Sequence, residues 1–265
     1  MTGNATEAPH AKGTILETRD LSRFFGQMAA LSAISLSIRE KEITSLIGPN
    51  GAGKTTFYNV ITGRFPPSSG KIFFKGRDIT GLAPHQIVKR GVGRSFQITS
   101  IFSGLTVLEN VRAAVIARSS ARMNLFTPVE SSRSLYEQSM RYLELIGLAD
   151  KKDDVCSILS HGDMRVVEIG ITLATEPDLI LLDEPTQGMT PEETKRMVNL
   201  IRDLSNRTET TFFIIEHDMN VVFSISDRIV VLYYGSILAD ASPDEIRSNR
   251  KVKEAYLGGL TDADG

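Results

Sequence analysis

The sequence predicts an α/β protein in which helices cover a largely parallel sheet. The short, continuous apolar run 179–182 is typical of a strand buried on both faces of such a sheet. After it, helical spacing over 191–206 is followed by apolar, strand-like runs over 211–215 and 229–233. A Gly-rich turn at 48–53, placed between an apolar strand and a helical stretch, fits the same class.

Two further regions divide the chain. Apolar and polar residues alternate over 34–39, which predicts a half-buried strand, and 42–47 and 71–74 are further strand candidates. From 106 to 175 apolar residues recur at helical spacing on both sides of a polar loop, 119–134. We therefore expect helices inserted, as a subdomain, between two sheet-forming regions.

The composition excludes several classes of protein. With 41% hydrophobic and 23% charged residues, the 265-residue chain is too apolar for a disordered protein. Its net charge of −2 gives no indication of a nucleic-acid-binding protein. The single cysteine, Cys156, rules out an intrachain disulfide and a cysteine-based zinc site, which fits a reducing, cytoplasmic setting.

A membrane span and a secretory signal are not predicted. No stretch reaches the roughly 18 consecutive apolar residues that a transmembrane helix requires. Residues 1–13 are polar and contain no apolar core. If the protein works at a membrane, we expect it to do so as a peripheral subunit.

The strongest motif is a phosphate-binding loop that matches G-x-x-x-x-G-K-[ST]. Its residues are Gly48, Pro49, Asn50, Gly51, Ala52, Gly53, Lys54 and Thr55. Glycines let backbone N–H groups turn toward an anion, and the following helix presents its positive N-terminus to it. Lys54 is placed to reach the β- and γ-phosphates of a nucleotide, Thr55 to ligate Mg²⁺, and Thr56 to reach the α-phosphate. The alternative, a chance match in a Gly-rich turn, is disfavoured by the strand before the loop and the helix after it.

An acidic pair, Asp183 and Glu184, ends the apolar run 179–182. Ligands of open parallel sheets bind at the carboxyl ends of the strands, so both side chains are predicted to face the nucleotide. Asp183 is then placed to hold Mg²⁺ through water, and Glu184 to orient and deprotonate the attacking water. The alternative is a plain strand end with two exposed acids, which the phosphate loop upstream disfavours.

Three more motifs follow in a fixed order. Gln97 follows a short apolar segment, the run Leu-Ser-His-Gly-Asp covers 159–163 directly before a predicted helix, and His217 follows the strand 211–215. Together with the phosphate loop and the acidic pair, these motifs stand in the order and spacing of the ATP-binding cassette (ABC) family. The chain resembles that family from about residue 14 to residue 258.

The resemblance implies a P-loop NTPase with a RecA-like core, an antiparallel N-terminal β-subdomain and an inserted helical subdomain. We expect one ATPase domain over 14–258. Its core covers about 14–97 and 176–240, its helical subdomain about 98–175, and a C-terminal tail about 241–265. The resemblance also implies ATP and Mg²⁺ as cofactors and hydrolysis of ATP as the reaction.

The resemblance also assigns roles to single residues. Two cassettes of this family pair head to tail, so the Ser160 hydroxyl and the Gly162 backbone would contact the ATP of the other subunit. Phe25 matches the aromatic residue that stacks on adenine. Gln97 matches the residue that senses Mg²⁺ and reports to the transporter, and His217 matches the residue that contacts the γ-phosphate. Outside this pattern, Phe25 is equally typical of a core and His217 of an ordinary strand end.

The chain departs from the general pattern at the signature Leu-Ser-Gly-Gly-Gln. His161 replaces the first Gly, Asp163 replaces the Gln, and Thr190 stands where an Asp often couples the two sites. A side chain at 161 crowds a close approach to phosphate, and the Asp163 charge repels it unless a cation such as Arg165 compensates. One hypothesis is that this site hydrolyses ATP slowly or works only opposite a different partner cassette.

Four stretches, 94–97, 105–111, 183–193 and 254–258, are similar to the ATPases of branched-chain amino acid importers. Urea and short-chain amide importers share much of this pattern, and lipopolysaccharide exporters have cassettes of similar size. The partners implied are membrane permease subunits, a second ABC ATPase subunit of the same or another kind and, indirectly, a solute-binding protein, with no nucleic acid. The implied location is the cytoplasm, peripheral on the inner face of the cell membrane.

Two other classes are weighed against a transporter subunit. Non-transport ABC ATPases of DNA repair or translation usually carry a long coiled coil or two cassettes, for which this chain has no room. A nucleotide-binding scaffold that has lost hydrolysis is disfavoured by the intact Lys54, Asp183, Glu184 and His217.

Overall fold

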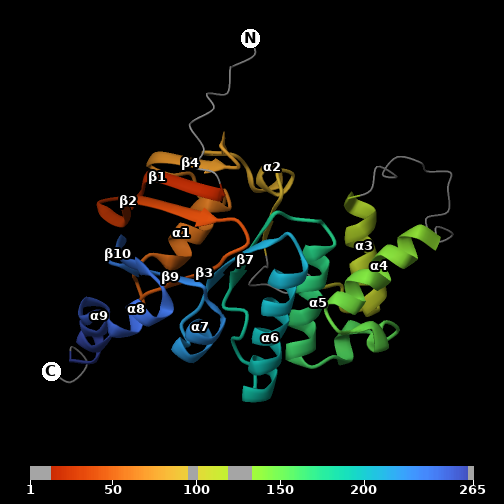
Figure 1. Cartoon of the computed structure of the whole chain (residues 1–265). Coiled ribbons are helices and arrows are strands. Elements are labelled where there is room, and N and C mark those ends of the chain that lie inside the picture. Colours follow the sequence, from red (N-terminus) through yellow and green to blue (C-terminus); the bar gives the residue numbers. More distant parts are fainter. Residues whose placement is uncertain (1–12, 95–100, 119–132, 262–265) are drawn as a thin grey trace, which may run out of the picture.

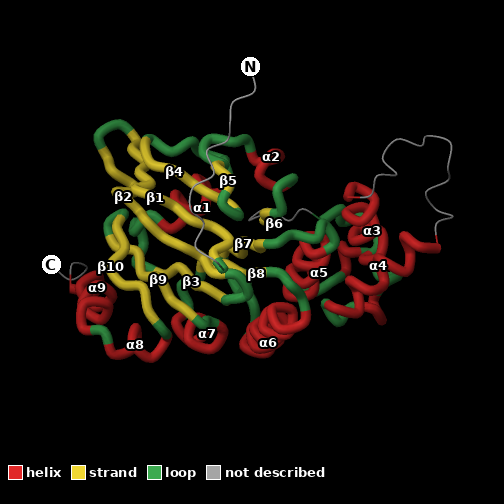
Figure 2. Tube along the Cα trace, turned by 45° about the horizontal axis from the view of Figure 1, so that its top comes forward, coloured by secondary structure: helices red, strands yellow, loops and turns green. Residues whose placement is uncertain are grey.

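The computed structural model describes residues 13–94, 101–118 and 133–261, and side chains as far as residue 256. Two sheets and a group of helices make up this part of the chain (Figure 1). The helices α3 (Val107–Arg118), α4 (Arg133–Leu145) and α5 (His161–Leu173) stand together at one side, beyond the strands β6 (Val92–Arg94) and β7 (Leu179–Asp183) (Figure 2). Helices α6 to α9 lie along the opposite face of the larger sheet from the smaller sheet (Figure 2).

The smaller sheet is antiparallel and has the strand order β2-β1-β4-β5. It consists of β1 (Thr14–Phe25), β2 (Met28–Arg39), β4 (Ser69–Phe74) and β5 (Arg77–Asp78). The predicted strands at 34–39 and 71–74 lie within β2 and β4, and the antiparallel N-terminal sheet is confirmed.

The larger sheet has the order β10-β9-β3-β8-β7-β6, and all its neighbours run parallel except β10 beside β9. Every residue of β3, β7 and β8 is buried, and for β7 the continuous apolar run 179–182 predicts this burial. The strands are β3 (Ile43–Ile47), β6 (Val92–Arg94), β7 (Leu179–Asp183), β8 (Thr211–Ile215), β9 (Arg228–Tyr233) and β10 (Ser236–Ala241).

Helices cover both faces of the larger sheet. Those that follow its strands are α1 (Lys54–Ile61), α6 (Pro191–Arg207), α7 (Met219–Ile225), α8 (Pro243–Ser248) and α9 (Arg250–Thr261), whereas α2 (Pro84–Val88) follows β5 of the smaller sheet. The helical group at the side contains α3 (Val107–Arg118), α4 (Arg133–Leu145), α5 (His161–Leu173) and two 3₁₀ turns, η3 (Ala149–Lys151) and η4 (Cys156–Ile158). None of the helices in the described ranges combines the length and the apolar character needed to cross a membrane.

The period of two along each strand divides the apolar side chains between two cores. Leu181 and Phe213 point into the core that lies between the two sheets and encloses α1. Their neighbours Ile180 and Phe212 point to the other face, against α3, α5 and α6. The ring centroids of Phe57 on α1 and Phe213 are 6.1 Å apart, so α1 is seated directly on the sheet. This packing fixes the loop that precedes α1.

The C-terminal segment packs against the strand that leads to that loop. Ile246 of α8 and Val252 of α9 are buried in a small third core with Ile47 of β3, and Tyr256 packs against the same core. Burial raises the pKa of Tyr256 to about 12, and its hydroxyl lies at the backbone of Gly48. The expected tail at 241–265 is therefore folded as two helices as far as Thr261.

Candidate functional site

The predicted phosphate loop joins the buried end of β3 to the first turn of α1. Gly51 and Gly53 have φ angles of +77° and +103°, which side-chain-bearing residues rarely adopt. A Cβ atom on Gly53 would lie 2.5 Å from the carbonyl oxygen of Ala30 in β2, so this position has no room for a side chain. The loop conformation is therefore held by the strands on either side, which is the preorganisation that phosphate binding requires.

Lys54 directly follows this loop, as the first residue of α1. Its Nζ donates to the carbonyl oxygens of Gly48, at 2.6 Å, and Pro49, at 3.1 Å. Burial lowers the pKa of Lys54, while the nearby Glu184 and Asp183 oppose that shift. The Lys54 ammonium group therefore lies at the N-terminus of α1. Its charge and the positive end of the helix dipole both favour an anion at this place.

Asp183 and Glu184 follow each other where β7 ends, as predicted. Asp183 is only 8% exposed, and its burial, reinforced by the charge of Glu184, raises its pKa to about 6. The charges of Arg94 and Lys54 act in the opposite direction. A buried carboxylate whose ionised form is disfavoured is a site that a divalent cation would stabilise.

Glu184 is held in an unusual backbone conformation. Its φ of +50° lies in the left-handed region, and its N–H donates to the carbonyl oxygen of Ile215 on the neighbouring strand β8, at 2.8 Å. Non-glycine residues keep such strain mainly at functional sites. His217 Nδ1 lies 3.5 Å from Glu184 Oε1, so the sheet brings the predicted base and the predicted histidine together.

These residues fit Mg²⁺ held jointly by the protein and a nucleotide. Mg²⁺ keeps several waters and takes one or two protein carboxylates together with substrate phosphates. Within the described residues no group of three or more His, Cys, Asp or Glu side chains is arranged to hold a metal by itself. Asp183 and the exposed Thr55, in the first turn of α1, are the ligands that this arrangement offers. Gln97, also predicted as a metal residue, lies outside the described residues.

Phe25 ends β1, opposite Met28 at the start of β2. Ala30, whose carbonyl borders Gly53, is two residues farther along β2, so Phe25 lies on the same side of the molecule as the phosphate loop. The Phe25 ring is 39% exposed, with the Arg23 guanidinium 4.7 Å from its centroid. An exposed aromatic near a phosphate loop is available for stacking.

The signature residues lie at the start of α5, not before it. The sequence predicts 159–163 directly before a helix, but Ser160 is the N-cap and the helix begins at His161. The Ser160 side chain accepts a hydrogen bond from the Asp163 N–H at 3.1 Å, which is the ordinary satisfaction of a helix start. Ser160 and Gly162 thus lie beside α6, in a different group of elements from the phosphate loop (Figure 1).

The expectation that Arg165 neutralises Asp163 is wrong. Asp163 Oδ2 pairs with Nζ of Lys151 at 2.5 Å, whereas Arg165 pairs with the buried Glu168 at 2.9 Å. Arg165 is turned inward because Glu168, one helical turn on, is only 4% exposed. Lys151 reaches Asp163 from the 3₁₀ turn before the signature.

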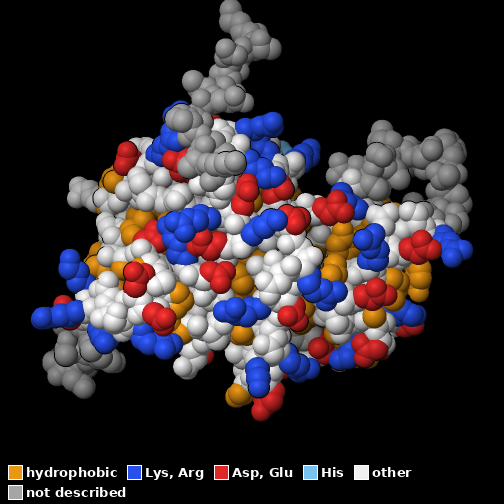
Figure 3. All heavy atoms as spheres, viewed as in Figure 1, with side chains coloured by type: hydrophobic (Ala, Val, Ile, Leu, Met, Phe, Trp, Pro, Cys, Tyr) orange, Lys and Arg blue, Asp and Glu red, His pale blue; other side chains and the backbone are white. Residues whose placement is uncertain are grey.

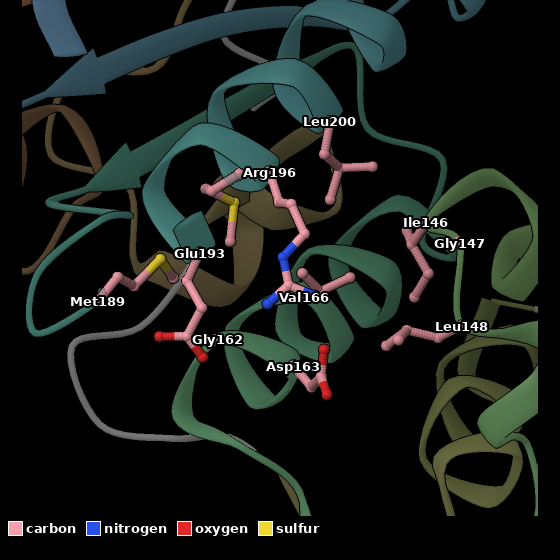
Figure 4. A pocket seen from close by; sticks show the side chains of 11 residues that line it. Ile146, Gly147, Leu148, Gly162, Asp163, Val166, Met189, Glu193, Arg196 and Leu200 are labelled. Atoms are coloured by element: carbon pink, nitrogen blue, oxygen red, sulfur yellow. The ribbon is translucent and has the colours of Figure 1, made fainter. Parts of the chain in front are cut away.

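A small pocket of about 120 Å³ lies between the signature helix and α6 (Figure 4). Leu148, Val166 and Leu200 provide apolar walls, and Glu193 points toward Gly162 at its edge (Figure 4). Glu193 was not among the predicted site residues. The spacing of Thr190 and Glu193 is that of a capping box, which marks a helix start but says nothing of the contact with α5.

The molecular surface around these sites is mixed in character. On the face shown in Figure 3, cationic and anionic side chains alternate over short distances, and apolar side chains appear in small groups between them. This face carries no broad field of one sign.

Comparisons with known proteins agree with this geometry. Residues 31–187 match the family model described as "ABC transporter", and residues 236–260 match one described as "Branched-chain amino acid ATP-binding cassette transporter". The chain is 41% identical to the high-affinity branched-chain amino acid transport ATP-binding protein LivG of Salmonella typhimurium, over 92% of this chain and 98% of that protein. It is 39% identical to the corresponding protein BraF of Pseudomonas aeruginosa, with the same coverage.

The solved structures that resemble it are cassettes as well. The ADP conformation of MJ1267, an ATP-binding cassette of an ABC transporter, superposes with a TM-score of 0.81 at 32% identity, over 92% of this chain and 99% of that one. CbiO1 of Clostridium perfringens, part of an ABC transporter complex, gives 0.78 at 26% identity over 95% of this chain and 100% of that one. The fold is that of a P-loop NTPase cassette, and the chain belongs to the ABC transporter family.

Proposed function

We propose that this chain is the ATP-hydrolysing subunit of a transporter that imports branched-chain amino acids. The observation that carries the catalytic part is the junction of Glu184, His217 and Lys54 at the carboxyl ends of β7, β8 and β3. The names of two similar relatives, LivG and BraF, carry the assignment of the cargo.

In this proposal the phosphate loop, residues 48–53, and Lys54 bind the phosphates of ATP, and Thr56 reaches the α-phosphate. Phe25 stacks on adenine. Asp183, Thr55 and Gln97 would hold Mg²⁺, which would supply positive charge to the phosphates.

Glu184 then orients and deprotonates the attacking water, as expected from its fixed backbone and its position next to His217. His217 contacts the γ-phosphate. The Ser160 hydroxyl and the Gly162 N–H face the ATP of a second cassette, because they lie at the start of α5, in a different group of elements from this chain's own phosphate loop. Closure of such a dimer on ATP, and its reopening after hydrolysis, would drive the permease.

An exposed apolar cluster supports a permease as partner. Backbone hydrogen bonds from Cys156 to Leu105 and from Ser157 to Ser103, both 3.0 Å, place η4 beside the segment that follows Gln97. Phe102 and Ile158 are 62% and 74% exposed there. Large apolar side chains that gather on a surface mark contact sites. This cluster is the proposed docking surface for the permease, on the inner face of the membrane.

The experiment that tests this function is a co-purification. A tagged Glu184→Gln variant, expressed in the source cells, is recovered from solubilised membranes with ATP present, and the proteins bound to it are identified by mass spectrometry. Two polytopic permease chains, with or without a different cassette, support the proposal. Recovery of the protein alone, or with ribosomes or DNA, would overturn it in favour of a non-transport ABC ATPase.

The cargo is tested separately by uptake of labelled leucine, isoleucine and valine into cells with and without the chain. Loss of that uptake supports the assignment. Unchanged uptake together with loss of urea or short-chain amide uptake would assign the chain to that related importer.

A further inference from the structure

The carboxylate of Glu193 lies on the backbone at the start of the signature helix. A Cβ atom placed on Gly162 would be 2.7 Å from Oε1 of Glu193, so the two residues are in direct contact (Figure 4). The N–H of Thr190, followed by the nearby Ser160 hydroxyl and Gly162 N–H, lowers the pKa of this carboxylate. A carboxylate of this chain therefore lies against the two residues that the proposed function assigns to the partner's ATP.

Two other hydrogen-bond donors at this helix start are already used. The N–H of Asp163 donates to the Ser160 side chain at 3.1 Å, and that of Met164 to the Ser160 carbonyl at 3.0 Å. The Gly162 N–H is one of the donors that a helix start leaves without a partner in its own helix. The Glu193 carboxylate lies beside this donor, where a helix start attracts anions.

Glu193 also belongs to the loop that follows the acidic pair. Its Oε2 accepts the N–H of Thr190 at 3.1 Å, and its own N–H donates to the Thr190 hydroxyl at 3.3 Å. Farther back, the N–H of Gln187 donates to the Glu184 carbonyl at 3.1 Å, and the Gln187 carbonyl lies 3.2 Å from Nε2 of His161. One short segment thus connects the proposed base of this chain's own site with the signature.

We infer that Glu193 is an internal occupant of the signature's anion site, which the terminal phosphate of the partner's ATP must displace before two cassettes can close. This inference rests on the proposed function, because it assumes that the signature receives a nucleotide from a second subunit. Arg196, one turn farther along α6, extends into the same pocket and offers the displaced carboxylate a cation (Figure 4). On closure, the terminal phosphate of the partner's ATP replaces the Glu193 carboxylate at Gly162. Movement of Glu193 then changes the contacts of the segment that follows Glu184.

The test compares ATP-dependent dimerisation in a Glu184→Gln background, where hydrolysis does not consume the ATP. Glu193→Gln removes the charge but keeps an acceptor oxygen for Thr190. Since a hydrogen bond to a charged group contributes more than one to a neutral group, we expect the ATP concentration for half dimerisation to fall about tenfold. Light scattering during ATP titration measures it.

A matched control is available in α8. Glu245 forms the same capping box, with its Oε2 accepting the N–H of Ser242 at 3.0 Å, and it follows the same order of N-cap, Pro and two acids. Glu245→Gln should lower the thermal unfolding midpoint as much as Glu193→Gln does, and should leave dimerisation unchanged. A purely structural role for Glu193 predicts that both variants behave alike in both measurements.

Two results would overturn the inference. The first is dimerisation that is unchanged or weakened by Glu193→Gln, relative to Glu245→Gln. The second is a monomer in every variant at saturating ATP, which removes the closed dimer on which the inference depends. If every variant stays monomeric, binding of a fluorescent ATP analogue to the same samples is measured. Binding would show that the chain still has the nucleotide site of the proposed function, although the inference about dimer closure has failed.

Discussion

Asp163 and Lys151 form an ion pair of 2.5 Å across the start of the signature helix. The carboxylate is 15% exposed, and the contact raises the pKa of Lys151, chiefly through the hydrogen bond to Asp163. An acid near the site of a phosphate repels it, so the proposed contact of the signature with ATP requires that the Asp163 charge be neutralised. The cation that does this comes from η3 and not from Arg165.

The first prediction concerns this pair. Lys151→Met leaves the Asp163 charge without its partner, and we expect the ATP concentration for half dimerisation in the Glu184→Gln background to rise about three- to tenfold. Adding Asp163→Asn to the same protein should restore dimerisation, because it removes the charge that Lys151 balances. Light scattering during ATP titration measures both effects.

The control is Lys152→Met, since the adjacent Lys152 pairs with Asp153 at the surface and should leave dimerisation unchanged. Strictly additive effects of Lys151→Met and Asp163→Asn would contradict a functional coupling between the two side chains.

The elements that carry the phosphate loop and the acidic pair could be predicted from the sequence because their signals are local. The phosphate loop and α1, at Lys54–Ile61, depend on residues within one strand, one turn and one helix. The strand at 179–183 carries its own signal, an apolar run closed by Asp183. By contrast, β1 was not predicted, because its alternation is interrupted by a shift of register between Thr18 and Leu21, where Asp20 has a φ of +48°.

What sequence could not supply were contacts between distant segments. Arg165 is closer to Asp163 in sequence than Lys151, yet the helix turns Arg165 toward Glu168 and the 3₁₀ turn brings Lys151 in. Likewise, Glu193 and Gly162 lie on two helices whose approach depends on the packing of α5 against α6. Such contacts depend on tertiary packing and leave no periodic trace in the sequence.

A second prediction concerns the role of Glu184. Glu184→Gln should bind Mg-ATP as the wild type does. Its hydrolysis rate should be at least about 10²-fold lower, which is the typical contribution of a positioned base. Phosphate release measures the rate, and equilibrium binding of a fluorescent ATP analogue measures affinity. Glu192→Gln, a nearby exposed acid, is the control. Near-normal turnover by Glu184→Gln would remove the base from the proposed mechanism.

A third prediction concerns pH. The pKa of Asp183 is about 6 in the folded protein, against an ordinary value of 3.8, so between these pH values the folded state binds more protons than the unfolded state. The free energy of unfolding should therefore fall as pH rises from about 4 to about 6, in nucleotide-free protein with EDTA. Asp183→Asn should remove this slope and stabilise the protein at pH 8 by about 1–2 kcal/mol, after allowance for solvent screening.

Urea unfolding at pH 4.5 and pH 8 measures this difference, with Asp203→Asn at the exposed surface of α6 as the control. Other groups around Asp183 contribute charge, namely Glu184, Glu216, Lys54 and Arg94, so only the difference between variant and wild type is diagnostic. A variant that is less stable than the wild type at pH 8 would show that the carboxylate is not under electrostatic strain.

The last prediction concerns the surface proposed for the permease. Ile158 is 74% exposed at the end of η4, beside Phe102, so Ile158→Asp adds a charge to the apolar cluster without entering the core. Because it touches no residue of the phosphate loop, ATP binding and the unfolding midpoint should stay within error of the wild type. Co-purification of the permease should fall at least about tenfold, since a charge buried without a partner at an interface is costly. Tyr136→Asp, a 40% exposed aromatic position on α4, should leave co-purification intact. Equal recovery of the permease with both variants would place its docking surface elsewhere.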